Sequence, residues 1–248
     1  MIRILGHRGA RDLWPENSIT GFRNAIGLGV DAVELDIHLS RDGEIVVMHD
    51  TTLERTTLGS GLVQDRTAAE LAATLLRDTA EGVPTLAAVL DVFQAASTEL
   101  FIEIKTDVVG RPYPGVERRI VDMLTRRGMI GRAGVVCFVP EILETVRRIE
   151  PALRVMAPVF RPTAQMVGGL ERMLDRLDAI PGCLVSVERT VLLHARQYCI
   201  DRIGPGRLCV GVTNDPDELD FWMTQCVYQV NSDRPDLALA ARARHLAR

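Results

Sequence analysis

The stretch over residues 33–50, VELDIHLSRDGEIVVMHD, constrains the fold of this chain more than any other part of it. Its apolar residues alternate with Glu34, Asp36 and His38, and a period of two is typical of a β-strand. Alternate side chains of a strand point to the same side, so the two carboxylates are predicted to share one face.

A tight hairpin is predicted to follow this strand. The Asp-Gly pair at 42–43 suits a two-residue turn, and an apolar run returns from it toward His49. With this pair as the loop, Arg41 pairs with Glu44, and counting back sets Asp36 opposite His49. The return strand must be antiparallel, because parallel strands cannot be joined by so short a connection.

Strand-like and helical segments alternate along the rest of the chain, which favours a parallel sheet covered by helices. Eight strands, without the hairpin's return strand, are predicted near residues 2–6, 32–38, 100–104, 134–138, 153–159, 183–187, 207–212 and 227–230. In the second half, helices are predicted near residues 115–127, 140–149, 163–178, 190–202 and 216–225.

Eight such units in 248 residues indicate an α/β fold of the (β/α)8 TIM-barrel type. We expect a single barrel domain over residues 1–248, with the hairpin and a small insertion after the second barrel strand. The insertion, at about 50–83, is expected to cover part of a site. A doubly wound open sheet is the alternative fold, but no Gly-rich dinucleotide-binding motif follows the first strand.

Charged residues and histidines stand where several of the predicted strands end. In a barrel of this type the active site lies at the C-terminal ends of the strands. The residues at or near such ends are His7, Arg8, Glu34, Asp36, Glu103 and Lys105.

The chemistry of this set favours phosphodiester cleavage. Three carboxylates form an oxygen-rich site that suits Mg²⁺ or Ca²⁺ better than zinc. Arg8 and Lys105 add positive charge for an anionic phosphate. His7 and His49 titrate near neutral pH and would supply one general base and one general acid.

Composition excludes several other kinds of protein. The formal net charge of −4 gives no basic footprint for nucleic acid, and no apolar run approaches the roughly 18 residues of a membrane span. The five cysteines form no CxxC pair, so mostly buried free thiols in a reducing compartment are expected. The start, MIRILGHRG, lacks a signal-peptide pattern, and a cytoplasmic location is expected. The oligomeric state stays open.

These motifs, in this order and spacing, resemble the glycerophosphodiester phosphodiesterase family. The motifs are His-Arg-Gly at 7–9, Pro-Glu-Asn at 15–17, Glu-Leu-Asp at 34–36, the hairpin into His-Asp at 49–50, and Glu-Ile-Lys at 103–105. The resemblance is dense to about residue 55, clear to about 105 and weaker beyond. There, Asn-Asp at 214–215 and Ser-Asp-Arg-Pro at 232–235 look like the family's last-strand signatures.

The resemblance implies a TIM-barrel hydrolase that splits a small-molecule glycerophosphodiester into glycerol 3-phosphate and an alcohol, with one divalent metal ion, Mg²⁺ or Ca²⁺. Carried over by motif, the metal ligands would be Glu34, Asp36 and Glu103. His7 and His49 would be the acid/base pair, and Arg8 and Lys105 would bind the phosphate. Attack by water and attack by the glycerol 2-hydroxyl through a cyclic phosphate both stay open.

The chain departs from the family pattern at Gly211, Cys137 and residues 225–228, which bears on substrate choice more than on chemistry.

Two rival functions from other classes stay open. One is a lipid-headgroup phosphodiesterase or lyase of the same superfamily, such as a lysophospholipase D. The other is a non-catalytic anion-binding barrel. Glu16 and Asn17 are predicted to cap the helix that follows and to orient Arg8.

Overall fold

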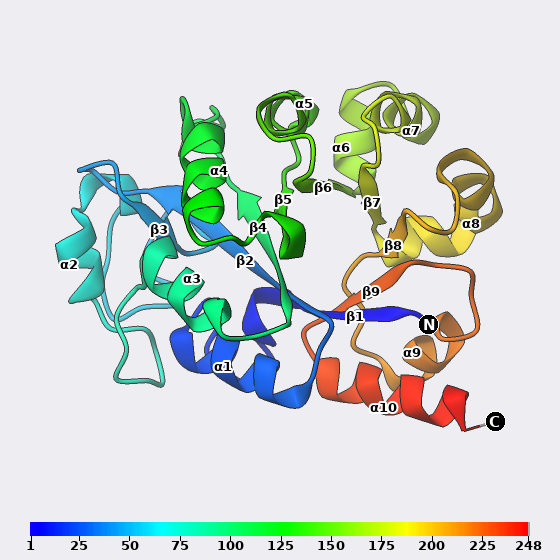
Figure 1. Cartoon of the computed structure of the whole chain (residues 1–248), viewed down its shortest axis with the longest axis horizontal. Coiled ribbons are helices and arrows are strands. Elements are labelled where there is room, and N and C mark those ends of the chain that lie inside the picture. The colour runs from blue at the N-terminus through cyan, green and yellow to red at the C-terminus, as the bar shows by residue number, and fades with distance from the viewer. Residues whose placement is uncertain (248) are drawn as a thin grey trace.

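The computed structural model describes residues 1–247, and within them eight parallel strands close into a barrel with helices outside it (Figure 1). The barrel closes because the first strand pairs with both the second and the last. The barrel strands are β1 (Arg3–Gly6), β2 (Ala32–Leu39), β4 (Glu99–Ile104), β5 (Ala133–Val136), β6 (Arg154–Val159), β7 (Leu184–Val187), β8 (Leu208–Val210) and β9 (Gln229–Ser232). The predicted (β/α)8 barrel is confirmed.

The outer layer packs on the barrel through the apolar faces of its helices. Phe22, Phe93 and Trp222 are fully buried there, and Leu5, Phe101 and Met156 belong to a separate apolar cluster of strand residues. The longer helices are α1 (Ile19–Leu28), α3 (Leu86–Gln94), α4 (Val116–Arg126), α5 (Pro140–Ile149), α6 (Arg161–Met166), α7 (Leu170–Asp178), α8 (Arg189–Ile203), α9 (Pro216–Trp222) and α10 (Pro235–Leu246).

Several predicted boundaries differ from the structure by a few residues. Strand β8 ends at Val210 rather than at residue 212, and α9 ends at Trp222 rather than at residue 225. The helix predicted over 163–178 is two helices, α6 and α7, because Gly168 and Gly169 adopt φ angles of 94° and 115°, which a continuous helix cannot contain. The last strand begins at Gln229 rather than at residue 227.

The predicted hairpin exists, but its register is shifted by one residue. Strand β3 (Ile45–Val47) pairs antiparallel with β2, and the Ser40 N–H donates to the Glu44 carbonyl at 2.9 Å. The loop therefore has three residues, with Gly43 at φ 82° as its left-handed residue. Consequently Met48, not His49, lies opposite Asp36, so the predicted pairing is wrong.

The segment over residues 50–83 packs through a small apolar cluster of its own. This cluster joins inward residues of the segment to β3, and its members are Val46, Met48, Leu53, Val63, Leu71, Leu76 and Val83. Helix α2 (Ala68–Ala72) begins with a capping box formed by Thr67 and Glu70. The hairpin and the segment are thus one packed unit above β2.

No helix in residues 1–247 has the length and apolar character needed to cross a bilayer. The thiols are all free. Cys226 is exposed and the four others are buried, in agreement with the expectation of mostly buried thiols: Cys137, Cys183, Cys199 and Cys209.

Candidate active site

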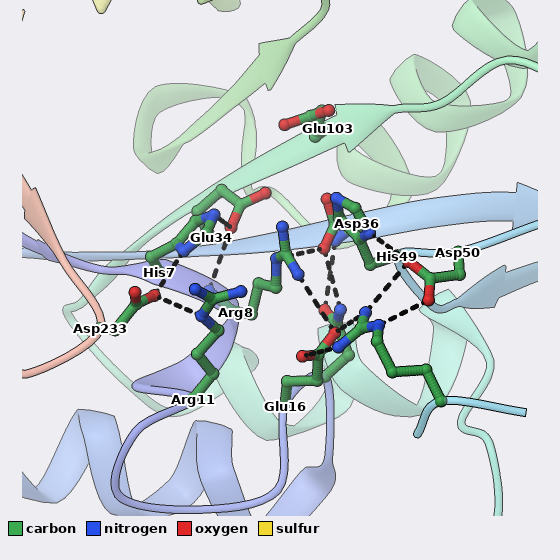
Figure 2. Close-up of polar contacts among 12 residues, drawn as sticks. His7, Arg8, Arg11, Glu16, Glu34, Asp36, His49, Asp50, Glu103 and Asp233 are labelled. Carbon is green, nitrogen blue, oxygen red and sulfur yellow. Dashed lines mark hydrogen bonds and ion pairs between the residues drawn. The ribbon is translucent and has the colours of Figure 1, made fainter. Parts of the chain in front are cut away.

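Three carboxylates meet at the C-terminal end of the barrel. Glu34 and Asp36 lie on β2, and Glu103 lies opposite Asp36 on the neighbouring strand β4 (Figure 2). One oxygen from each carboxylate lies within 4.8 Å of the other two, and all three side chains are buried. The shared face predicted for this strand therefore brings together the three predicted metal ligands.

Burial favours the protonated form of all three carboxylates, and nearby cations set Asp36 apart from the other two. It raises the pKa of Glu34 well above its usual value, and the neighbouring carboxylates Asp36 and Glu103 raise it further. Burial also raises the pKa of Glu103. Burial favours the protonated form of Asp36 as well, but Lys105 and Arg8 outweigh it and hold the pKa of Asp36 below its usual range.

Two cations partly neutralise the cluster. Lys105 Nζ lies 2.8 Å from Asp36 Oδ1 and forms a second ion pair with Glu103. The Arg8 guanidinium lies 3.3 Å from Asp36 Oδ2, and the Arg8 backbone N–H donates to Glu34 Oε2 at 3.0 Å. Arg8 makes this approach from a left-handed conformation, at φ 51°, in the 3-10 turn that follows β1.

His7 stands in the same turn, directly after β1. Its Nδ1 lies 2.6 Å from Asp233 Oδ1, and its Nε2 lies 3.8 Å from Glu34 Oε2. Asp233 follows β9 and is also held by Arg11, at 2.9 Å, and by the Asn214 side-chain amide, at 2.9 Å. Sequence reasoning assigned no role to Asp233, although the motif at 232–235 contains it.

His49 has a matching arrangement on the other side of Arg8 (Figure 2). Its Nδ1 lies 2.6 Å from Asp50 Oδ1. Burial and the charge of Lys105 lower the pKa of His49 to about 4, despite the opposing effect of Asp36. The His49 backbone carbonyl lies 3.0 Å from His38 Nε2. Each histidine thus has an aspartate behind its Nδ1, which leaves Nε2 free for a reacting group.

Asn17 reaches the cluster instead of capping the first helix. Its side-chain amide donates to Asp36 Oδ2 at 2.9 Å, and its oxygen accepts the Asp36 backbone N–H at 3.2 Å. Ser18 caps α1 through the Gly21 N–H. Glu16 accepts a hydrogen bond from Arg8 at 3.2 Å, as the predicted orienting role requires.

The donor set fits a hard divalent cation. Glu34 Oε1 is buried and has no hydrogen-bond partner, so one acceptor in the cluster is left for another positive group. Oxygen ligands of this kind are the ones that Mg²⁺ and Ca²⁺ prefer. Glu34, Asp36 and Glu103 could therefore hold one such ion.

A pocket of about 60 Å³ adjoins the carboxylates and is apolar on its other side. Phe138 and Phe160 wall it, with ring centroids 5.2 Å apart. Gly211 also lines it, and a Cβ there would meet the Val187 carbonyl oxygen at 2.9 Å. The departure at Gly211 is thus tied to the close approach of two backbones, which leaves no room for an aromatic side chain.

Comparisons with known proteins match the chain to one family. Residues 7–189 match the model of the Glycerophosphoryl diester phosphodiesterase family. A Bacillus altitudinis protein named glycerophosphodiester phosphodiesterase is 29% identical over 98% of both chains. A protein of the same name from Caldanaerobacter subterraneus subsp. tengcongensis is 33% identical over 61% of this chain and 64% of its own length.

Solved structures share the fold along the whole chain. A putative glycerophosphoryl diester phosphodiesterase from Agrobacterium tumefaciens has a TM-score of 0.88 at 25% identity, over 100% of both chains. A phosphodiesterase from Oleispira antarctica, solved with its product sn-glycerol-3-phosphate, has a TM-score of 0.79 at 22% identity, over 97% of this chain and 96% of that one. At that identity the second likeness shows the fold alone.

Proposed function

The chain belongs to the glycerophosphoryl diester phosphodiesterase family, and we propose that it hydrolyses a glycerophosphodiester to sn-glycerol 3-phosphate and an alcohol. The observation that carries this proposal is the convergence of a buried carboxylate cluster with two histidines, each backed by an aspartate. The names of the relatives supply the substrate class.

In this proposal Glu34, Asp36 and Glu103 hold one divalent ion, Mg²⁺ or Ca²⁺. When bound, the ion supplies positive charge that stabilises the non-bridging oxygens of the phosphate. Arg8 and Lys105 then exchange part of their contact with the carboxylates for contact with the phosphate, which a planar guanidinium and an ammonium both suit.

His7 and His49 form the acid/base pair. One Nε2 takes the proton of the nucleophile, and the other gives a proton to the leaving alkoxide. The pKa of about 4 for His49 supports its role as the base, because its ring is then neutral at neutral pH. His7, whose Nδ1 lies 2.6 Å from Asp233 Oδ1, is then left to act as the acid.

The nucleophile is either water or the glycerol 2-hydroxyl, and the two leave different traces. Attack by the hydroxyl forms a cyclic phosphate before water opens it, whereas direct attack does not. Phosphorus NMR during turnover with a limiting amount of enzyme separates the two courses, because only the first accumulates a five-membered cyclic phosphate signal.

The experiment that tests the reaction class measures release of glycerol 3-phosphate from glycerophosphodiesters with choline, ethanolamine, glycerol and inositol groups. Each is assayed with Mg²⁺, with Ca²⁺ and with chelator. We expect metal-dependent release that Glu103→Gln abolishes and that Glu144→Gln, at an exposed residue of α5, leaves unchanged. No release from any substrate by folded, metal-loaded protein would contradict the proposal.

One observation favours a lysophospholipase D-like activity as a second candidate. The apolar wall beside the carboxylates continues into a cleft of about 450 Å³. Phe160, Pro162 and Val212 line one part of this cleft, and Glu188, Arg189 and Thr190 line the rest. A cleft of this kind could take the acyl chain of a lysophospholipid. Faster choline release from lysophosphatidylcholine than from glycerophosphocholine would favour this candidate, and the reverse ranking would exclude it.

A further inference from the structure

Arg55, in the segment that follows the hairpin, contacts carboxylates on two sides of the candidate site. Its Nε and Nη2 donate to the two oxygens of Asp50, at 2.6 and 3.0 Å. Its Nη1 and Nη2 donate to the two oxygens of Glu16, at 2.7 and 2.8 Å. The guanidinium therefore makes four hydrogen bonds and holds two carboxylates bidentately.

Both carboxylates also hold a residue of the proposed machinery. Asp50 Oδ1 lies 2.6 Å from His49 Nδ1, and Glu16 Oε1 accepts a hydrogen bond from Arg8 at 3.2 Å (Figure 2). A chain of hydrogen bonds thus runs from the imidazole through Arg55 to the guanidinium of Arg8.

We propose that Arg55 is a positioning residue: through the two carboxylates that it clamps, it fixes His49 and Arg8 relative to each other. This inference rests on the proposed function, in which these two residues act on the phosphate. The proposal also assigns a role to the segment at 50–83, because this segment places Arg55 at the C-terminal end of the barrel, beside the candidate site.

The geometry distinguishes this group from an ordinary surface ion pair. Exposed single pairs contribute about 0–1 kcal/mol, because two long side chains must be ordered in water. Here the Arg55 side chain is 45% exposed, but its partners Glu16 and Asp50 are only 11% and 25% exposed. Their remaining contacts are with Arg8 and His49, so the clamp orders groups that are partly shielded from water.

Lysine cannot replace this arginine. Its ammonium is a single point with three donors, whereas the planar guanidinium presents a rigid fork that matches two carboxylates at once. The Arg55→Lys variant would keep the positive charge but lose the bidentate hydrogen bonds to the two carboxylates. The lysine variant therefore separates positioning from simple electrostatics.

The kinetic test uses Arg55→Met and Arg55→Lys in the metal-loaded full chain. We expect kcat to fall about 10- to 100-fold in both, with a smaller change in KM, as for other residues that orient a reacting group through a second side chain. Arg66→Met is the matched control, because Arg66 is exposed in the same segment and its side chain contacts only the Ser60 carbonyl. A kcat for Arg55→Lys equal to that of the wild type would overturn the proposal.

A double-mutant cycle identifies the route of the effect. In the Glu16→Gln/Asp50→Asn background, adding Arg55→Met should change kcat by less than about twofold, because the groups it acts through are already altered. A further loss as large as in the wild-type background would overturn the proposal, since Arg55 would then act by another path.

Nitrogen NMR of histidine-labelled, metal-free protein provides a readout that needs no activity. Arg55→Met should shift the His49 ring resonances, and His194, exposed on α8, should keep its own. An unchanged His49 signal would overturn the positioning role. If the wild type releases no glycerol 3-phosphate, the proposed function fails, and this measurement still decides the role of Arg55.

Discussion

His7 Nδ1 lies 2.6 Å from Asp233 Oδ1, although the two residues are 226 positions apart in the chain. The carboxylate is almost fully buried, which alone would favour its protonated form. The hydrogen bonds from His7 and Asn214 outweigh burial and keep the pKa of Asp233 below its usual value. Asp233 therefore meets the imidazole as a charged acceptor.

We expect Asp233→Asn to lower kcat by about 10- to 100-fold, because the amide no longer fixes the tautomer and orientation of the His7 ring. Steady-state kinetics on the best glycerophosphodiester measure this change. Asp236→Asn is the control, since that carboxylate pairs only with Arg234 at the start of α10. Equal activity of the Asp233 variant and the wild type would remove Asp233 from the mechanism.

The lowered pKa of His49 predicts an acid-sensitive stability. A histidine in the unfolded chain titrates near pH ~6.5, whereas the folded protein binds this proton only near pH 4. Between these values the unfolded state takes up a proton that the folded state does not, so the free energy of unfolding falls as the pH falls.

Urea unfolding of metal-free protein across this pH window tests the expectation. His49→Gln removes the titrating group, so its free energy of unfolding should fall less steeply than that of the wild type. The other four histidines are common to both proteins and cancel in the comparison. Parallel curves for the two proteins would show that His49 is not buried as a neutral ring.

Metal binding should release protons. The pKa values of Glu34 and Glu103 are raised in the metal-free protein, and a bound cation favours their charged forms. Calorimetry with Mg²⁺ or Ca²⁺ in buffers of different ionisation enthalpy measures the release. The affinity should rise with pH, and the melting temperature should rise with metal because the ion binds the folded state.

Glu34→Gln is the variant for this measurement. It should weaken metal binding and release fewer protons, while the exposed Glu144→Gln should match the wild type. Metal-independent melting together with no proton release would contradict the carboxylate site itself, whatever the enzyme's activity.

The thiols differ in reactivity because four are buried. Burial raises the pKa of Cys137 and of Cys183 to about 12, and that of Cys199 to about 11, so their thiolates are scarce at neutral pH. A disulfide reagent at neutral pH should label one thiol in the native protein and five after unfolding. Cys226→Ser should abolish the native reaction, and labelling of that variant would show that a buried thiol becomes accessible.

Local patterns were enough to predict the barrel and the convergence of the carboxylates in the candidate site. Alternation in β2 places Glu34 and Asp36 on one face, and the parallel pairing of β2 with β4 then brings Glu103 beside them. Both steps depend on spacing within a few residues and on a rule for the end of the barrel that carries the site.

Features that depend on tertiary packing were missed. The predicted hairpin register is wrong because Ser40, rather than Arg41, pairs with Glu44. An Asp-Gly pair fits both a two-residue and a three-residue loop, so the sequence does not choose between them. Asp233 lies far from His7 in sequence, and Arg55 lies in a polar segment without periodicity. No local pattern therefore identifies the partners of either residue.

Strand β2 is shared along one side by two different neighbours. Strand β1 pairs with it at Ala32 and Val33, and β3 pairs with it from Ile37 to Leu39. Between these two neighbours, the Asp36 backbone N–H donates to the Asn17 side-chain oxygen, and the Met48 backbone N–H donates to the Asp36 carbonyl. Without these partners, the C-terminal half of β2 would expose unpaired backbone N–H and C=O groups, and a strand of another molecule could pair with them. The hairpin that brings His49 to the site therefore also shields the chain from association through this edge, so damage to it would cost solubility as well as catalysis.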